Sequence, residues 1–178
     1  MTKWTTDVMD AQRADGAHAD VAPVMKGLNY AAPAWADAGT IVPWVIYEQY
    51  GDTRILARSV QSMTKWVEWC RLHSTGLIRD KDRGNDYGDW LSIEADTPKD
   101  LIGTAYFARS TDILARSLRV LGRVEDAKEY EELLAGIKQA FNKKYVQSDG
   151  RIYGNTQCCY VLALEFDLLP QEDRKSVV

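Results

Sequence analysis

The hydrophobic positions divide this chain into helices of two kinds. Two stretches, residues 40–50 and 157–169, are apolar on nearly every side of a helix, and a third, residues 99–121, has apolar or small residues over a broad arc. Three others carry only a narrow apolar stripe with steps of three or four residues: residues 1–11, 52 to about 76, and 125–145. A helix that is apolar all round is buried among other helices, whereas a striped helix lies at the surface. The two kinds alternate along the chain, which predicts inner helices covered by outer ones.

Glycines and capping residues mark several of the helix ends. Gly51 and Gly122 each fit the position just past a helix, because glycine readily adopts the left-handed conformation needed there. Asp52 is a favoured N-cap residue for the helix that follows Gly51. These signals predict two helical hairpins, each joined by a tight glycine turn.

Other boundaries leave alternatives open. If Thr40 caps the helix before Gly51, Pro43 falls harmlessly in the first turn; a start near Asp37 would place Pro43 where it kinks the helix. A turn and a short strand are expected at residues 148–153. Residues 171–178 have the acidic composition of a further helix start.

Two long segments show no helical period, residues 17–36 and 76–98. Loops of this length in a compact domain are usually functional or disordered. Both lead into inner helices, so we expect them to emerge at the same end of the layers. The aromatic and acidic residues expected to converge there are Trp35, Asp37, Asp86, Asp89 and Trp90.

An alternating ring of inner and outer helices is an α/α toroid, so the predicted fold class is all-α. The chain holds two complete hairpins, one further inner helix and pieces of two outer helices. We therefore expect residues 1–178 to be a fragment of one larger toroid domain. Such a fragment leaves inner-helix surface uncovered, which predicts self-association, soluble aggregation or marginal stability.

Composition narrows the classes of partner. The 178 residues are 46% hydrophobic and carry a net charge of −4 with interspersed signs, which argues against nucleic-acid binding. No apolar run approaches a membrane span, and the first residues lack the apolar stretch of a signal peptide. These features do not indicate the cellular compartment of the protein. Three cysteines and two histidines show no metal-ligand spacing, so we expect no disulfide framework, metal or cofactor.

The loop residues suggest carbohydrate chemistry. An indole packs against the apolar face of a sugar ring while nearby carboxylates accept hydrogen bonds from its hydroxyls. Trp35 with Asp37, and Asp89 with Trp90, offer this pairing twice. The alternative is that both tryptophans merely plug the rim of the core.

Catalytic alternatives come from the same loops. Two carboxylates among Asp86, Asp89 and Glu94 would suit acid and base roles on a glycosidic bond, although a solvated acidic loop is the commoner outcome. His18 with Asp20 is either a proton-transfer pair or an ordinary polar loop segment. The three cysteines lie at apolar helical positions and are expected to be core thiols: Cys70, Cys158 and Cys159.

Together these motifs resemble the α-L-rhamnosidases of glycoside hydrolase family 78. The resemblance runs in order over essentially the whole chain. It rests on the following residues: Asp20-Val21-Ala22-Pro23, Trp35-Ala36-Asp37-Ala38-Gly39, Pro43-Trp44, Tyr47, Tyr50-Gly51-Asp52, Met63, Trp66, Tyr87-Gly88-Asp89-Trp90-Leu91, Lys99-Asp100-Leu101 and Ala105-Tyr106-Phe107.

The resemblance implies part of an (α/α)6 barrel that hydrolyses terminal L-rhamnose with inversion. It implies that Trp35 and Trp90 line the rhamnose pocket, with Asp37 and Asp89 as pocket-side or loop-bracing acids. The family's general acid belongs to an acidic motif that nothing in this chain matches, and its base lies in a later part of the barrel. The chain would thus bind an L-rhamnose glycoside but carry no catalytic residue, and we expect it to be inactive alone.

Two other readings remain. One is a helical scaffold that binds protein partners without chemistry, although a scaffold has little need of Trp and Asp gathered at one loop end. The other is a piece of a different α/α-barrel carbohydrate enzyme that acts on another sugar.

Overall fold

The computed structural model describes residues 2–171 and 174. Its helices are α1 (Thr2–Asp10), α2 (Ala38–Tyr50), α3 (Thr53–Leu72), α4 (Lys99–Val120), α5 (Val124–Tyr145) and α6 (Gln157–Glu165). Pairing of extended backbone among the described residues is limited to isolated bridges, one of them between Val146 and Ile152. The all-α class is therefore confirmed, while the short strand expected near residue 152 is wrong.

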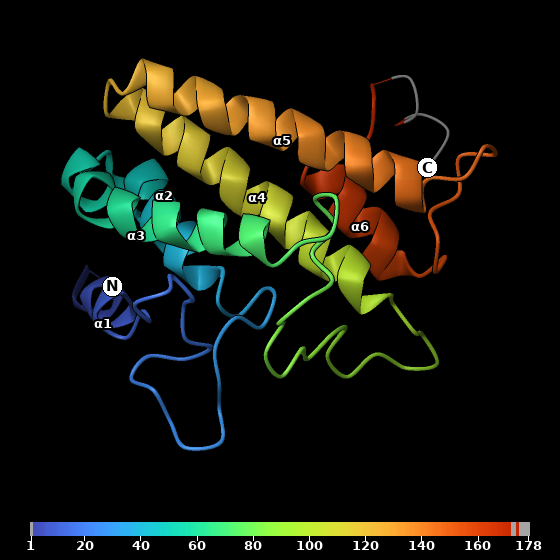
Figure 1. Ribbon diagram of the computed structural model, residues 1–178, viewed down its shortest axis with the longest axis horizontal. Helices are drawn as coiled ribbons and strands as arrows, with labels where there is room; N and C mark the ends of the chain where they lie inside the picture. The colour runs from blue at the N-terminus through green and yellow to red at the C-terminus, as the bar shows by residue number, and fades with distance from the viewer. Residues whose placement is uncertain (1, 172–173, 175–178) are drawn as a thin grey trace.

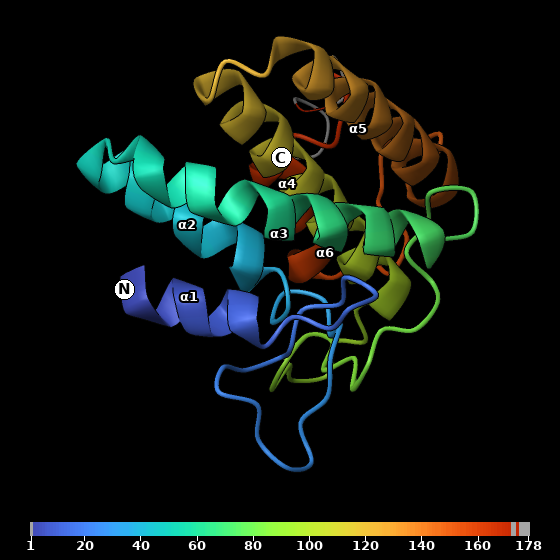
Figure 2. The same cartoon turned by 60° about the vertical axis from the view of Figure 1, so that its left-hand side comes forward.

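The helices form two hairpins in two layers (Figure 1). α2 and α3 are joined at Gly51, and α4 and α5 at Gly122; both glycines have a left-handed backbone, with φ of 65° and 75°. α4 lies centrally and packs against both α2 and α6, whereas α3 and α5 cover the hairpins from outside. α1 lies beside α2 and α3, as the turned view in Figure 2 shows. This is the predicted alternation of inner and outer helices in a partial toroid.

α3 shows why the striped pattern folds as it does. The Asp52 carboxylate accepts a hydrogen bond from the backbone N–H of Arg54 and so caps the first turn, as expected. The predicted apolar stripe of α3 is buried: Leu56, Val60, Met63, Val67 and Cys70. Most of the stabilisation of such a helix comes from burying this face.

α3 ends before the predicted boundary near Gly76. Its last residue is Leu72, because side chains satisfy the terminal carbonyls there: His73 Nδ1 binds the carbonyl of Trp69 and the Ser74 hydroxyl binds that of Cys70.

α6 is also shorter than expected, ending at Glu165 rather than near residue 169. Asp167 adopts a left-handed φ of 53°, which breaks the helix, yet Leu168 and Leu169 beyond it are still buried. The helix start expected at residues 171–178 falls mostly outside the described residues.

α2 begins at Ala38, so Thr40 is not its cap and Pro43 lies inside the helix. The Thr40 hydroxyl instead binds the carbonyl of Asp37 and the hydroxyl of Ser110 on α4. This brings the start of α2 against α4 and pulls Asp37 into the core.

The apolar inner helices are not fully covered. Val45 and Tyr50 of α2 and Val161 of α6 are exposed. Uncovered apolar surface of this kind is what the sequence led us to expect, whereas self-association stays a prediction. None of the helices described is long and apolar enough to cross a membrane.

Both long loops hang from the same edge of the helical layers, the lower edge in Figures 1 and 2. The first connects α1 to α2 and the second connects α3 to α4. This shared edge places the candidate site.

Candidate functional site

Three aromatic rings meet where the two loops come together. Trp35 belongs to the first loop, and Tyr87 and Trp90 belong to the second. The ring centroid of Trp35 lies 4.6 Å from that of Tyr87 and 6.0 Å from that of Trp90, and the last two lie 5.5 Å apart. Trp35 is 39% exposed and Trp90 is 59% exposed. We call these three residues the rim cluster; it presents two indoles to solvent on one surface.

Asp37 lies beneath Trp35 and not beside it on the surface. Its carboxylate is 1% exposed, and one oxygen accepts hydrogen bonds from Trp66 Nε1 at 2.9 Å and Ser110 Oγ at 2.6 Å. The other oxygen accepts the backbone N–H of Ala34 at 2.9 Å. Burial raises the pKa of Asp37, while these hydrogen bonds and the nearby Arg79 charge act in the opposite direction.

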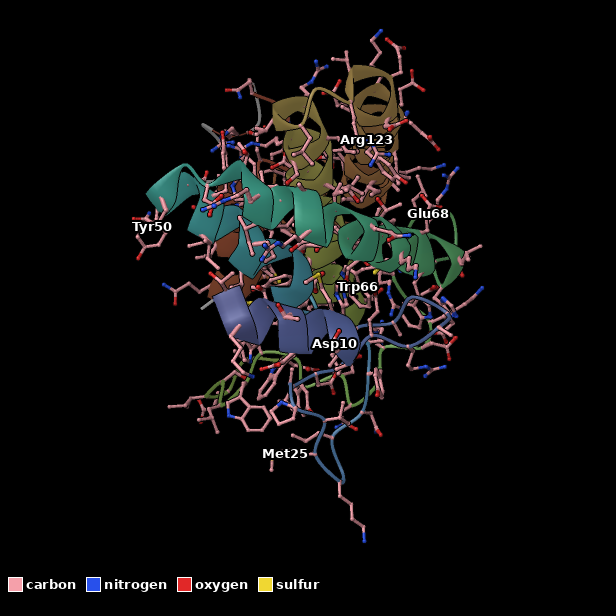
Figure 3. All side chains as sticks on the ribbon, turned by 90° about the vertical axis from the view of Figure 1, so that its left-hand side faces the viewer. Asp10, Met25, Tyr50, Trp66, Glu68 and Arg123 are labelled. Carbon is pink, nitrogen blue, oxygen red and sulfur yellow. The ribbon has the colours of Figure 1, made fainter. Side chains whose placement is uncertain are left out.

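The partners of Asp37 anchor the first loop to the helices. Trp66 is inside the molecule on α3 (Figure 3). Ser110 lies on α4. In contrast, Met25 sits at the tip of the same loop, which projects away from the helices (Figure 3). Because both oxygens of Asp37 are occupied by protein donors, its geometry is that of a loop-bracing acid.

Asp89 has a different environment, beside a cavity of about 340 Å³. One of its carboxylate oxygens accepts the Thr97 hydroxyl at 2.9 Å, and Thr97 in turn contacts the Thr156 hydroxyl at 2.7 Å. Cys158 at the start of α6 lines the same cavity, and burial raises the pKa of its thiol to about 11, with the Asp89 charge adding to the effect. Asp89 is half-buried and lines this cavity, whereas the residues of the rim cluster are not among those that line it.

Asp20 connects the two loops. It is 5% exposed; one oxygen accepts the backbone N–H of Ala32 at 3.0 Å and the other accepts the Tyr87 hydroxyl at 3.2 Å. A second link runs from Asn29 to Asn85 at 2.8 Å, and Asn85 donates to the Tyr87 hydroxyl at 2.8 Å. The first loop thus holds the ring at the centre of the rim cluster.

His18 and Asp20 form no hydrogen bond with each other among the described contacts. His18 is fully buried: Nδ1 donates to the carbonyl of Ala36 at 3.1 Å, and Nε2 lies 2.9 Å from the Ser62 hydroxyl. Burial lowers the pKa of His18 to about 4, although the bond to Ala36 acts against this. The pair is therefore not a proton-transfer pair, and His18 is a structural residue under the loop.

Two candidate acids of the second loop remain, Asp86 and Glu94. Asp86 is paired with Arg83 at 2.6 Å, and Glu94 is exposed. Among the described residues, His, Cys, Asp and Glu side chains form no group of three suited to holding a metal ion. Tyr87 and Asp20 both belong to the motifs found in the sequence, but the hydrogen bond between them was not predicted. An acid in one loop and a phenol in the other were the only indication of it in the sequence.

The paired inner and outer helices define the class of the domain as a helical-hairpin toroid. Two exposed indoles lie over the edge from which its loops emerge. The whole chain, residues 1–178, matches the model of the bacterial alpha-L-rhamnosidase 6 hairpin glycosidase domain. The chain therefore belongs to this family.

Individual relatives agree with this assignment. An alpha-L-rhamnosidase of Streptomyces avermitilis is 46% identical over 99% of this chain, and one of Alteromonas sp. is 33% identical over 96%. The crystal structure of the Streptomyces avermitilis enzyme complexed with L-rhamnose superposes with a TM-score of 0.93, also at 46% identity over 99% of this chain. The alpha-L-rhamnosidase of Dictyoglumus thermophilum superposes with a TM-score of 0.87 at 28% identity over 98% of this chain. The chain spans only 17% of the length of the Streptomyces avermitilis enzyme, and 20% of the length of the Alteromonas sp. and Dictyoglumus thermophilum enzymes.

Proposed function

We propose that this chain forms part of the sugar-binding wall of a glycosidase that removes terminal L-rhamnose from glycosides with inversion. Family membership supports the reaction class. The observation that carries the binding role is the rim cluster, in which indoles from two loops, Trp35 and Trp90, lie 6.0 Å apart and open to solvent. Exposed apolar side chains gathered on one surface, rather than scattered singly, are typical of binding sites.

The rim cluster has the chemistry that a deoxy sugar requires. L-rhamnose carries a methyl group and an apolar ring face, which pack against indole, and hydroxyls, which need acceptors. Asp89 precedes Trp90 in the sequence and lines the cavity of about 340 Å³, and we assign to its carboxylate the role of accepting such a hydrogen bond. Asp37 supports the wall from below, because protein donors already occupy its oxygens.

Catalysis requires more than this wall. Inversion needs a general acid and a general base about 6.5–9.5 Å apart, on opposite sides of the bond, with a water between them. Asp20 and Asp37 are buried and hydrogen-bonded, and Asp86 is paired with Arg83. The contacts leave Asp89 and Glu94 open, but the family's general acid has no counterpart in this chain and its base belongs to a later part of the barrel. We therefore assign no catalytic residue to this chain and expect the acid and base to come from other parts of a complete barrel.

A segment exchange tests the proposal. Residues 1–178 would replace the matching segment of the Streptomyces avermitilis enzyme, and hydrolysis of an aryl α-L-rhamnoside would be followed. We expect the chimaera to turn over and the isolated chain to be inactive. Trp35→Ala and Trp90→Ala should each raise KM at least fivefold, because stacking on an aromatic side chain contributes about 1 kcal/mol or more.

Tyr50→Ala is the matched control, since Tyr50 is an exposed aromatic that lies at the far end of α2 from the first loop. It should leave KM unchanged. A folded chimaera in which both tryptophan variants behave like Tyr50→Ala would contradict the binding role. Turnover by the isolated chain that disappears in Asp89→Asn would contradict the absence of a catalytic residue.

A further inference from the structure

The helices alone do not determine the separation of the two exposed indoles. Trp35 and Trp90 lie in segments without regular secondary structure, and their loops meet only through side-chain and backbone contacts. Such segments have many conformations of similar energy, so some specific interaction has to select one. Besides the ring contacts themselves, the hydrogen bond from the Tyr87 hydroxyl to Asp20 joins the loops directly at the rim cluster, while Asn29 reaches the same hydroxyl through Asn85.

Tyr87 is the ring that touches both indoles. Its centroid lies 4.6 Å from Trp35 and 5.5 Å from Trp90, both closer than the indoles lie to each other. Any rotation of the Tyr87 ring therefore moves at least one indole. Two hydrogen bonds restrain that rotation, one given to Asp20 and one received from Asn85.

A carboxylate at position 20 is an energetically unfavourable way to join the two loops. It is 5% exposed, and among the described residues no lysine or arginine pairs with it. Burying an unpaired carboxylate costs free energy unless donors surround it, and here the donors are a backbone N–H of the first loop and a phenol of the second. An apolar side chain would fill the same space at lower cost but could not bind both loops.

We propose that Asp20 is a positioning residue which, through Tyr87, sets the spacing of Trp35 and Trp90 and hence the affinity for the sugar. The link between spacing and affinity rests on the function proposed above. The link between Asp20 and spacing does not, because it concerns the free protein.

The 178-residue chain itself allows the spacing to be measured. Three of its tryptophans are buried in the core, Trp44, Trp66 and Trp69, and Trp4 is half-buried. Quenching of tryptophan fluorescence by iodide therefore reports mainly on the exposed pair in the rim cluster. Near-ultraviolet circular dichroism adds the coupling between the stacked rings.

Tyr87→Phe is the decisive variant, because it keeps the ring and removes only the hydroxyl. We expect it to change iodide quenching and the near-ultraviolet spectrum while leaving the far-ultraviolet helix signal unchanged. Asp20→Ala should produce the same spectral change, and Asp20→Asn, which retains an acceptor and adds a donor, should restore most of the original signal. Adding Asp20→Ala to Tyr87→Phe should produce a smaller spectral change than Asp20→Ala produces in the parent, because the bond between Asp20 and Tyr87 is already absent and only the bond from Ala32 is lost.

Affinity for L-rhamnose is then measured by fluorescence titration and, in the segment exchange, as KM. Tyr87→Phe should weaken binding about fivefold, the effect of one net hydrogen bond, with kcat unchanged. Unaltered quenching and spectra in Tyr87→Phe would overturn the positioning role. Altered spectra with unaltered KM would overturn its link to affinity. Failure of the unmodified chimaera to bind rhamnose at all would count against the proposed function alone, since the spectral comparison would still stand.

Discussion

Replacing Gly39 with alanine should destabilise the protein, although glycine to alanine in a helix ordinarily stabilises it by up to about 1 kcal/mol. Gly39 lies in the first turn of α2 with an ordinary negative φ. A Cβ atom built there would lie closer than 3.0 Å to three atoms of the His18 ring. That ring is fully buried and held by two hydrogen bonds, so it has nowhere to move.

The expected size follows from these contacts. Overpacking a core costs about 1–3 kcal/mol, and each disturbed His18 hydrogen bond adds about 1 kcal/mol. After subtracting the helix-propensity gain, Gly39→Ala should lower the free energy of unfolding by about 2–4 kcal/mol. For a chain of this length that corresponds to a melting temperature lower by roughly 4–16 °C.

Gly136→Ala provides the matched control. Gly136 is also helical, in α5, but the nearest atom to its added Cβ is the flexible end of Leu77 at 3.0 Å. This variant should stay within about 1 kcal/mol of the parent. Urea unfolding followed by circular dichroism measures both, and the slope of the unfolding curve checks that the transition is comparable.

A double variant separates the clash from other effects. In a His18→Ala background the ring is absent, so adding Gly39→Ala should cost almost nothing, which gives a coupling energy of about 2 kcal/mol or more. The reasoning is refuted if Gly39→Ala is as stable as Gly136→Ala, or if the two substitutions at positions 18 and 39 prove additive.

Three further outcomes follow from the buried titratable groups. The pKa of His18 is about 4 in the folded chain, below its usual 6.5, so only the unfolded chain takes up this proton as the pH falls from 7 to 4. Urea titrations should therefore show that the free energy of unfolding falls by up to about 3 kcal/mol across that window, and by less in His18→Gln. The raised pKa of Asp37 acts in the opposite sense, because it favours proton uptake by the folded chain. Cys158 is half-buried while Cys70 and Cys159 are buried, so a thiol reagent at pH 8 should label Cys158 first and the others only in denaturant; equal labelling rates would contradict the packing. Asp37→Asn should lower the free energy of unfolding by about 1–3 kcal/mol, because an amide cannot accept from all three donors; a stability equal to the parent would contradict the bracing role.

Helices and turns could be predicted because their signals are local. The stripe of α3, its Asp52 cap and the glycine turns at Gly51 and Gly122 each depend on neighbours within a few residues. The boundary errors arose where side chains intervened from outside the pattern. His73 caps α3 early, and the Thr40 hydroxyl serves a contact to α4 rather than a helix cap.

The meeting of Trp35 and Trp90 could also be anticipated, since both loops precede inner helices and must emerge at one edge. The role of each acid could not. The sequence left Asp37 open as a pocket-side or a loop-bracing acid, because its partners Trp66 and Ser110, which draw it inward, stand 29 and 73 residues away.

The sequence by itself therefore determined the all-α class, the alternation of inner and outer helices, and which loops carry aromatic residues. These depend on hydrophobic periodicity, which any helix must obey to bury one face. Only the tertiary structure decided which acids face solvent and which are buried, and that Asp20 binds Tyr87 across 67 residues. Burial and hydrogen bonding of a loop side chain depend on distant parts of the chain, and no local pattern encodes them.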